Sequence, residues 1–599
     1  MFNKYIQYTL LFVITSILAG CATNKNLEIR PPNQNTHRSI PVGELIGYVH
    51  ENRAHAWLGI PYAKPPIGDL RWKAPRPKPS WEGVLNATEF GAPCTQIGST
   101  FGDPEAKVGS VHGSEDCLYL NIFAPLNIGE NEKLPVMLWI HGGSNTIGTA
   151  KLYDPSVLAS TQRVIVVTLN YRLGIFGWFY HPSIKNLSES PEDGSGNYGT
   201  LDQIQSLKWI RQNISHFGGD NENITIFGES AGGHNVYTLL FSPLAEGLFH
   251  KAISQSGSTK TLSIDQAVSI DDSIKNNSNG TSSKEILNQL IIAEGLASDR
   301  SSAIEIQNTM QDHEVVNFLR NQSKEQIIST YYNNLDNKDY MHKVINDGYV
   351  VPIEGMNFNS DKLINVPIIM GTNRDEMKLF LAFDPEFTSQ RFSLTFIKDQ
   401  DFYDISSEYG SEGWKVAAVD KPASELALNG NDKVFGYRFD WDEEPKVFLM
   451  DFSRILGAAH AIEIPFIMGG LELGGLEDYM FDEDNIDEAK KLSLAMMSYW
   501  SEFAYNGDPG SGRNGELKKW ESWSSLANSS KFLIIDTPND GGLRMEKQAL
   551  SYDSLVEKLL LDDRIPNDSI RCMMLDKAID ADWEIDKSIL KSGLCDGMN

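Results

Sequence analysis

The most constraining feature of the sequence is an apolar run that ends at a serine held between glycines. Residues 223–233 read NITIFGESAGG, and the residues that follow up to Phe241 suit a helix. A strand joined to a helix through Gly-x-Ser-x-Gly needs a sharp turn, in which side chains two positions either side of the serine would clash. Gly228 and Gly232 avoid that clash. The pattern predicts a strand–turn–helix unit that lifts Ser230 above a sheet edge, next to the positive end of a helix dipole.

Neighbouring segments alternate between strand and helix patterns. Residues 134–140 (LPVMLWI) and 163–172 (RVIVVTLNYR) are continuous apolar runs typical of buried strands, whereas residues 201–214 place apolar side chains at helical spacing. Residues 366–376 (VPIIMGTNRDE) form another strand that runs into a loop. This alternation predicts an α/β fold with a largely parallel central sheet covered by helices on both faces.

Two long stretches are harder to interpret. Residues 265–330 look helical and polar around a loop, KNNSNGTSSK, and residues 380–455 show no clear pattern. Insertions in an α/β sheet usually lie at the carboxyl ends of the strands, so we expect helical insertions over the functional site. No repeat or second domain is evident, and residues 40–599 are predicted to form a single domain with insertions.

The first residues have the features of an export signal. An apolar stretch from about Tyr8 to Ala19 is too short to span a bilayer comfortably. It ends in Leu-Ala-Gly-Cys, which resembles the lipobox of bacterial lipoproteins. We therefore predict a signal peptide at 1–20, a lipidated Cys21, and a flexible tether at 21–39. The protein would then sit in the bacterial cell envelope, on the periplasmic side or at the outer membrane, with lipid as its only membrane contact. An uncleaved anchor is the alternative.

Composition excludes several classes of partner. The formal charge is −28, and nucleic acids and anionic membrane surfaces both require basic patches. No Cys/His group has zinc spacing, and no glycine-rich phosphate loop is present. We therefore predict no nucleic-acid partner, no metal and no nucleotide cofactor.

The five cysteines suggest two disulfides. If Cys21 carries lipid, an even number remains in an exported protein, and pairing neighbours is the simplest of three connectivities. That choice joins Cys94 to Cys117 and Cys572 to Cys595. The first bridge would close a loop worth about 3 kcal/mol in the chain-entropy model.

If Ser230 reacts, a base must take its proton. Histidine suits this role because its unperturbed pKa lies near 6.5. In units of this type the chain order is serine, acid, histidine, and five histidines follow the serine: His234, His250, His313, His342 and His460. His234 lies one turn along the same helix and is badly placed to face the serine oxygen. His460 follows a Gly/Ala-rich approach, RILGAAH, that would let a loop carry its ring close, so it is favoured over core or surface roles.

The remaining parts of such a site can also be located. Asp375 and Glu376 follow the VPIIM strand, and spacing alone does not choose between them or exclude a solvated loop carboxylate. A negative oxygen formed in the reaction needs backbone N–H donors. Ala231, directly after the serine, is one candidate; Gly143 and Ser144, in the HGGS turn after the 134–140 strand, are the others.

Together these motifs resemble the carboxylesterase type-B family, which includes carboxylesterases, cholinesterases and related lipases. The resemblance runs in order from about residue 42 to at least 525. It is carried by residues 56–75, 114–123, 169–178, 196–233, 249–258, 370–376, 457–466 and 500–509.

The resemblance implies an α/β hydrolase fold and a Ser–Glu–His triad. Ser230 matches the family nucleophile, Glu376 the acid, and His460 the histidine, which favours Glu376 over Asp375. It also implies that Cys94–Cys117 is the family's early disulfide, because Cys117 lies in the SEDCLYLN signature. The Cys572–Cys595 pair has no such support, because the C-terminal tail matches the family poorly.

Two positions depart from the family pattern. The family usually has a third glycine where this chain has Ser144, and a left-handed conformation there would cost serine about 1–2 kcal/mol. Cholinesterases carry a tryptophan for the quaternary ammonium inside the loop closed by the early disulfide. Between Cys94 and Cys117 the aromatic residue is Phe101, so a choline-specific enzyme loses its main support.

The sequence therefore predicts a serine carboxylesterase that hydrolyses small-molecule esters through an acyl-enzyme, without a cofactor. A lipase or a specialised detoxifying esterase is the alternative within enzymes. A binding protein on the same fold is the remote one, because such members typically lose the nucleophile and this chain keeps all three triad residues.

Overall fold

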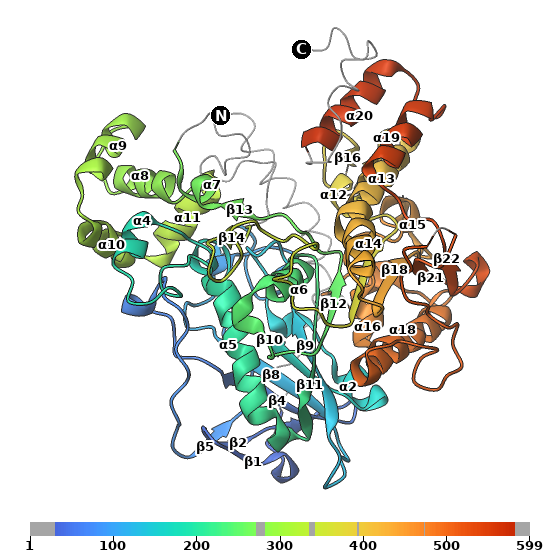
Figure 1. Ribbon diagram of the computed structural model, residues 1–599, viewed down its shortest axis with the longest axis horizontal. Helices are drawn as coiled ribbons and strands as arrows, with labels where there is room; N and C mark the ends of the chain where they lie inside the picture. The colour runs from blue at the N-terminus through green and yellow to red at the C-terminus, as the bar shows by residue number, and fades with distance from the viewer. Residues whose placement is uncertain are drawn as a thin grey trace. The chain divides into compact units, whose positions relative to one another are not determined.

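The computed structural model describes residues 30–270, 282–334, 342–391, 394–472, 474–526 and 528–580 (Figure 1). The chain divides into two compact units. The first unit comprises Leu27–Ile253 and Gly257–Val366, and the second contains Ser254–Ser256 and Pro367–Asn599.

The longer strands of the first unit, with the short β3, form a mixed sheet. Their order is β11 (Gly219–Glu229), β9 (Leu134–Ile140), β10 (Ile165–Leu169), β8 (Tyr119–Pro125), β4 (Ala54–Pro61) and β3 (Tyr48–Val49). The predicted parallel pairing holds for β9 with β10 and β11, whereas β8, β4 and β3 pair antiparallel. The short turn between β3 and β4 permits only antiparallel pairing. Every residue of β9 is buried, which explains its uninterrupted apolar sequence.

Two helices fix the end of β11. Helix α6 (Ala231–Phe241) begins directly after Ser230, and all of its residues are buried. It packs against β11, β9 and α5 (Tyr198–Asn213), which covers the predicted 201–214 segment. Because α6 is enclosed along its whole length, its first turn is held firmly against the sheet.

The described part of the polar segment after residue 264 is helical, as predicted, whereas most of the predicted loop KNNSNGTSSK lies outside the described residues. It contains α7 (Ile264–Val268), α8 (Ser283–Ala293), α9 (Arg300–Thr309), α10 (Asp312–Asn321) and α11 (Lys324–Asn334). Helix α8 packs against α7, α9 and α11, and these helices form the green group in Figure 1.

The second unit carries its own strands. β15 (Ile368–Asn373), β18 (Val434–Phe439) and β21 (Phe532–Ile535) are parallel, and β22 (Arg544–Glu546) pairs antiparallel with β21. Helix α18 (Ile486–Asn506) packs against α16 (Ile464–Met468).

The stretch that showed no pattern in the sequence folds into many short pieces of the second unit. They include α12 (Lys378–Leu381), the hairpins β16–β17 (Thr388–Arg391, Leu394–Ile397) and β19–β20 (Lys446–Val447, Met450–Asp451), and α13 (Gln400–Lys415). A π-helical turn, Val416–Asp420, joins α13 to α14 (Lys421–Leu428). No single period of hydrophobic residues can describe such a mixture.

The predicted Cys94–Cys117 disulfide is present and both residues are buried. Cys572 is buried in α20 (Asp568–Asp580), but its predicted partner Cys595 lies outside the described residues, as do Cys21 and the signal peptide. In the part of the chain that the structure describes, no helix combines the length and the apolar character needed to cross a bilayer.

Candidate active site

Ser230 occupies the predicted sharp turn between β11 and α6. Its backbone has φ 58° and ψ −122°, a region that residues other than glycine enter at a cost of about 1–3 kcal/mol. The flanking glycines are sterically required, since a Cβ at Gly228 would lie 2.5 Å from the Ile140 carbonyl oxygen, and one at Gly232 would lie 2.0 Å from it. The side chain of Ser230 remains partly exposed while its neighbours Glu229 and Ala231 are buried.

The predicted oxyanion turn packs against this serine. A Cβ on Gly142 would lie 2.8 Å from the Glu229 carbonyl oxygen and 3.1 Å from Ser230 Cβ. Gly143, Ser144 and Asn145 then have φ values of 97°, 56° and 58°. The left-handed conformation foreseen for Ser144 is thus present, and it extends to the next residue.

His141 supports the turn as a neutral ring. Burial lowers the pKa of His141 to about 4. The ring stacks on Tyr171 with centroids 4.5 Å apart, and the Tyr171 hydroxyl donates to the His141 carbonyl oxygen at 2.6 Å. The stacked neutral ring and the hydrogen-bonded backbone carbonyl together fix the path of the chain as it enters the turn.

In the second unit, Glu376 and His460 are brought together. His460 Nδ1 lies 2.5 Å from Glu376 Oε2, although the residues are 84 positions apart. Glu376 follows β15 and has no exposed surface, and the side chain of His460 is 6 % exposed. A buried carboxylate in this position orients the imidazole and stabilises its protonated form.

Two polar residues that sequence reasoning missed hold Glu376 in place. The Ser256 hydroxyl donates to Glu376 Oε1 at 2.5 Å, and the Asn373 backbone N–H donates to the same oxygen at 2.7 Å. The side chain of Asn373 also donates to the Ala459 carbonyl oxygen at 2.7 Å, one residue before His460. Isolated Ser and Asn residues leave no local pattern. Their one signal was that both lie in segments that carry the family resemblance, 249–258 and 370–376.

A second buried carboxyl group lies behind this pair. Glu463 accepts from the Gln255 side chain at 3.0 Å and from the Asn373 side chain at 2.7 Å. Burial raises the pKa of Glu463, and the charge of Glu376 acts in the same direction. Both effects make Glu463 harder to ionise than an exposed glutamic acid.

Asp375, the alternative acid, has other partners. Its carboxylate pairs with Arg374 at 2.8 Å and with Lys378 at 3.4 Å. Adjacent residues in the loop after β15 thus do different things, with Glu376 contacting the histidine and Asp375 forming ion pairs.

The rival histidines are engaged elsewhere. His234 is buried, its Nδ1 lies 2.7 Å from the Ser258 carbonyl oxygen, and burial lowers its pKa to about 4. His250 Nδ1 accepts from the Ile224 backbone N–H, and His342 lies between the Tyr331 hydroxyl and the Trp178 carbonyl oxygen. His313 is exposed on α10.

Aromatic rings line one side of His460. The His460 ring centroid lies 4.8 Å from that of Trp414 on α13 and 5.4 Å from that of Phe380 on α12. Phe380 is 44 % exposed. The histidine therefore has an apolar, partly open wall beside it.

Comparison with known proteins identifies the family of the chain. Residues 34–418 and 414–552 match the model of the carboxylesterase family. This chain belongs to that family. It is 36 % identical over 522 residues to para-nitrobenzyl esterase of Bacillus subtilis (strain 168), covering 84 % of this chain and 95 % of the relative. It is 31 % identical to a medium-chain fatty acyl-CoA hydrolase precursor of Anas platyrhynchos, covering 92 % and 97 %.

A solved structure is similar over nearly the same range. A thermophilic PNB esterase superposes with a TM-score of 0.66 at 30 % identity, covering 87 % of this chain and 99 % of that one. The carboxylesterase thus has the α/β hydrolase fold expected from its sequence, and it is a carboxylic ester hydrolase.

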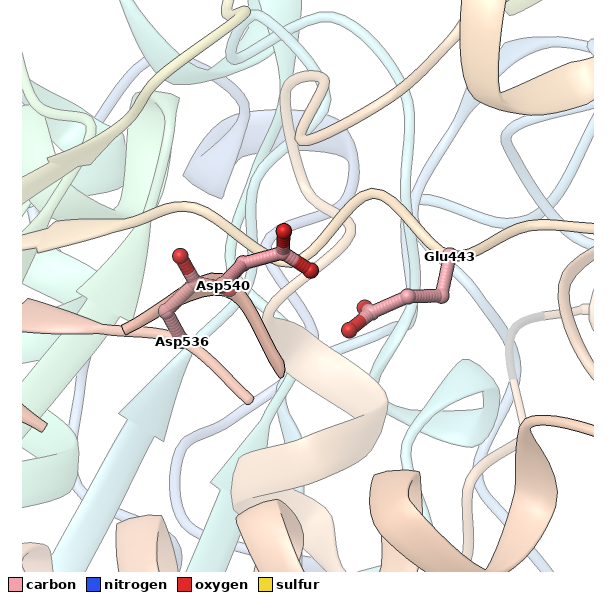
Figure 2. A group of neighbouring side chains, drawn as sticks. All are labelled: Glu443, Asp536 and Asp540. Atoms are coloured by element: carbon pink, nitrogen blue, oxygen red, sulfur yellow. The ribbon is translucent and has the colours of Figure 1, made fainter. Parts of the chain in front are cut away.

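The carboxylesterase also has an acidic cluster apart from these residues (Figure 2). Carboxylate oxygens of Glu443, Asp536 and Asp540 lie within 4.8 Å of one another. The cluster already has partners within the chain. The Thr537 hydroxyl donates to Glu443, the Thr537 N–H donates to Asp536 at 2.9 Å, and Arg544 lies 3.5 Å from Asp536. Its donor set therefore gives no reason to assign a metal.

This cluster makes the stability of the carboxylesterase depend on pH. Burial raises the pKa of Asp536 to about 6, and nearby Asp440 acts in the same direction. Between about pH 4 and 6 the folded state then binds more protons than the unfolded state, so stability falls as pH rises through that window. Across this window, we expect the free energy of unfolding of Asp536→Asn to fall by about 1–2 kcal/mol less than that of the parent. Thermal midpoints at pH 4.5 and pH 7.5 would measure it.

Asp540→Asn is the matched control, since that residue belongs to the same cluster but is exposed. Because the charge of Asp540 is the smallest of the effects that act on the Asp536 pKa, this variant should reduce the difference between the two midpoints much less than Asp536→Asn does. An Asp536→Asn variant whose midpoints change with pH as steeply as those of the parent would contradict the prediction.

Proposed function

We propose that the chain hydrolyses carboxylic esters through an acyl-enzyme formed on Ser230. His460 takes the proton of the serine hydroxyl as the oxygen attacks the ester carbonyl, and Glu376 orients and stabilises the imidazolium. The alcohol leaves with the proton from His460. Water, activated by the same histidine, then releases the acid and restores the serine.

The negative oxygen of each tetrahedral intermediate would be held by the backbone N–H groups of Gly143, Ser144 and Ala231. Such a donor is typically worth about 2.7–4 kcal/mol of barrier lowering. The turn that contains Gly143 and Ser144 packs directly against the elbow, which supports this assignment.

The observation that carries the proposal is the contact between buried Glu376 and His460. Two buried groups so far apart in sequence are held at 2.5 Å by a network that includes Ser256 and Asn373. A strained serine at the elbow and a buried acid–histidine pair are the parts that a Ser–Glu–His triad requires.

A fluorophosphonate probe tests this proposal. We expect one equivalent to attach covalently to Ser230, located by peptide mass spectrometry, with loss of ester hydrolysis in proportion to labelling. Labelling at another serine, or full activity after complete labelling of Ser230, would contradict it. A protein that resists the probe and hydrolyses no ester would point to the binding role instead.

We further propose that the substrate has an apolar group next to its ester bond. The partly exposed Phe380 and the neighbouring Trp414 flank His460, and the names of two relatives refer to a nitrobenzyl ester and a fatty acyl thioester. Rates for p-nitrobenzyl esters of increasing acyl length should exceed those for a choline ester. Preference for emulsified triglyceride would indicate the lipase alternative.

For localisation, we propose export and lipid anchoring through Cys21. The Cys94–Cys117 disulfide supports export, because such bonds persist mainly in oxidising compartments. Labelled palmitate should be incorporated by the full chain in a Gram-negative host and not by Cys21→Ser. Equal incorporation by both would overturn the anchor.

A further inference from the structure

The turn assigned to oxyanion binding is strained at two residues that are not glycine. Gly143, Ser144 and Asn145 follow one another in the left-handed region, with φ values of 97°, 56° and 58°. Glycine adopts this conformation freely, whereas Ser144 pays about 1–2 kcal/mol and Asn145, of a residue type that enters this region more readily, pays less. Such a conformation persists only when surrounding contacts over-determine it. The question is which contacts do so here.

Both polar atoms of the Asn145 side chain and its carbonyl oxygen form hydrogen bonds. Its side chain has no exposed surface. The side-chain Nδ2 donates to the His342 carbonyl oxygen at 3.0 Å, and Oδ1 accepts from Asn235 Nδ2 at 2.9 Å. The Asn145 carbonyl oxygen accepts from the Gly174 backbone N–H at 2.6 Å.

The two side-chain bonds reach elements that matter for the turn. His342 also donates its own backbone N–H to the Ser144 carbonyl oxygen at 2.9 Å, so it holds two consecutive residues of the turn. Its ring is in turn fixed by the Tyr331 hydroxyl at 2.5 Å. Asn235 lies on α6, the helix that begins directly after Ser230.

We infer that Asn145 is a positioning residue for the oxyanion site. Together with Asn235 and the backbone of His342 it forms what we call the oxyanion clamp. The clamp ties the turn to the helix of the nucleophile, so that the Gly143 and Ser144 N–H groups keep their direction relative to Ser230. This inference rests on the proposed function, and it adds a role for a side chain that touches no reacting atom.

A simpler explanation is that asparagine is present only because it tolerates a left-handed backbone. Two substitutions separate the explanations. Asn145→Gly keeps a residue that tolerates the left-handed backbone but removes the side-chain hydrogen bonds of the clamp. Asn145→Ala removes both the tolerance and the hydrogen bonds. If the clamp matters, both variants should lose activity; if tolerance alone matters, Asn145→Gly should behave like the parent.

We expect kcat for a nitrophenyl ester to fall about 10–100-fold in both variants. This fall is smaller than the one seen when an oxyanion donor is removed outright. KM should change less than about threefold, because ground-state binding does not use the oxyanion donors. The inhibition constant of a trifluoromethyl ketone, which forms a tetrahedral adduct on the serine, should rise in step with the fall in kcat. Asn235→Ala should act in the same direction.

Asn170→Ala provides the matched control. Asn170 is also a buried asparagine of the first unit that joins loops, accepting from the Ala150 N–H at 2.8 Å and donating to the Ala92 carbonyl oxygen at 3.1 Å. Its loss should lower the thermal midpoint without changing the ketone's inhibition constant. Parent-like kinetics for Asn145→Gly, or an unchanged inhibition constant in both Asn145 variants, would overturn the clamp. An inactive parent protein that resists the fluorophosphonate would instead overturn the proposed function, and the clamp with it.

Discussion

Replacing Ser230 by alanine is expected to lower kcat for ester hydrolysis by about 10⁴-fold or more, because it removes the only atom that forms the acyl-enzyme. The fold should survive the change. Alanine and serine both carry a Cβ and so bear the same strain at φ 58°. The measurement is single-turnover release of nitrophenolate alongside a thermal midpoint.

The thermal midpoint is the control that shows whether the Ser230→Ala protein is folded when its activity is measured. We expect it to stay within about 3 °C of the parent, since a partly exposed hydroxyl contributes little to stability. Parent-like turnover in a folded Ser230→Ala protein would remove the mechanism, whatever the other residues do.

Glu376→Gln is expected to have the second largest effect, a loss of about 10³–10⁴-fold in kcat. The substitution keeps the size of the side chain, so the cavity and the bonds from Ser256 and Asn373 can be retained. The amide, however, presents an N–H₂ group where the carboxylate accepted from His460 Nδ1. The histidine then favours the tautomer that carries its proton on the wrong nitrogen, and the positive charge formed during attack has no counter-ion.

Asp375→Asn is the matched comparison for this variant. Asp375 is adjacent in sequence, yet it pairs with Arg374 and Lys378 and not with the histidine. We expect a change in thermal midpoint and at most about a tenfold change in kcat. The Asp375 carboxylate reaches the histidine loop through the Ala458 backbone N–H at 3.3 Å, so its loss affects the reaction only through small shifts in position. If Asp375→Asn proved the more damaging substitution for kcat, the role assigned to Glu376 would be wrong.

Some features of the fold were predictable because the burial and backbone geometry of a few neighbouring residues determine them. The strand at 134–140 has the predicted bounds, since its residues are all buried and hence all apolar. Gly228 and Gly232 were expected from the tightness of the elbow, and the structure shows the clashes that a side chain would cause. The Cys94–Cys117 disulfide is confirmed as well.

Long-range features were less accessible. No sequence pattern between residues 376 and 460 indicates that the side chains of Glu376 and His460 are in contact. Only the family resemblance favoured Glu376 over Asp375. Asn373 and Glu463 shape the surroundings of His460 through contacts with residues distant in sequence. The antiparallel strands β3, β4 and β8 also escaped prediction, because the alternation of strands with helices describes only the segments that follow them.

The geometry at Ser230 restricts which nucleophiles this backbone could ever carry. A left-handed residue has little room for a second heavy atom on Cβ, so threonine, which is branched there, would crowd the adjacent backbone. Cysteine is unbranched and would fit. A change of nucleophile at this elbow, evolved or engineered, is therefore expected to give cysteine. Threonine would first require a different turn.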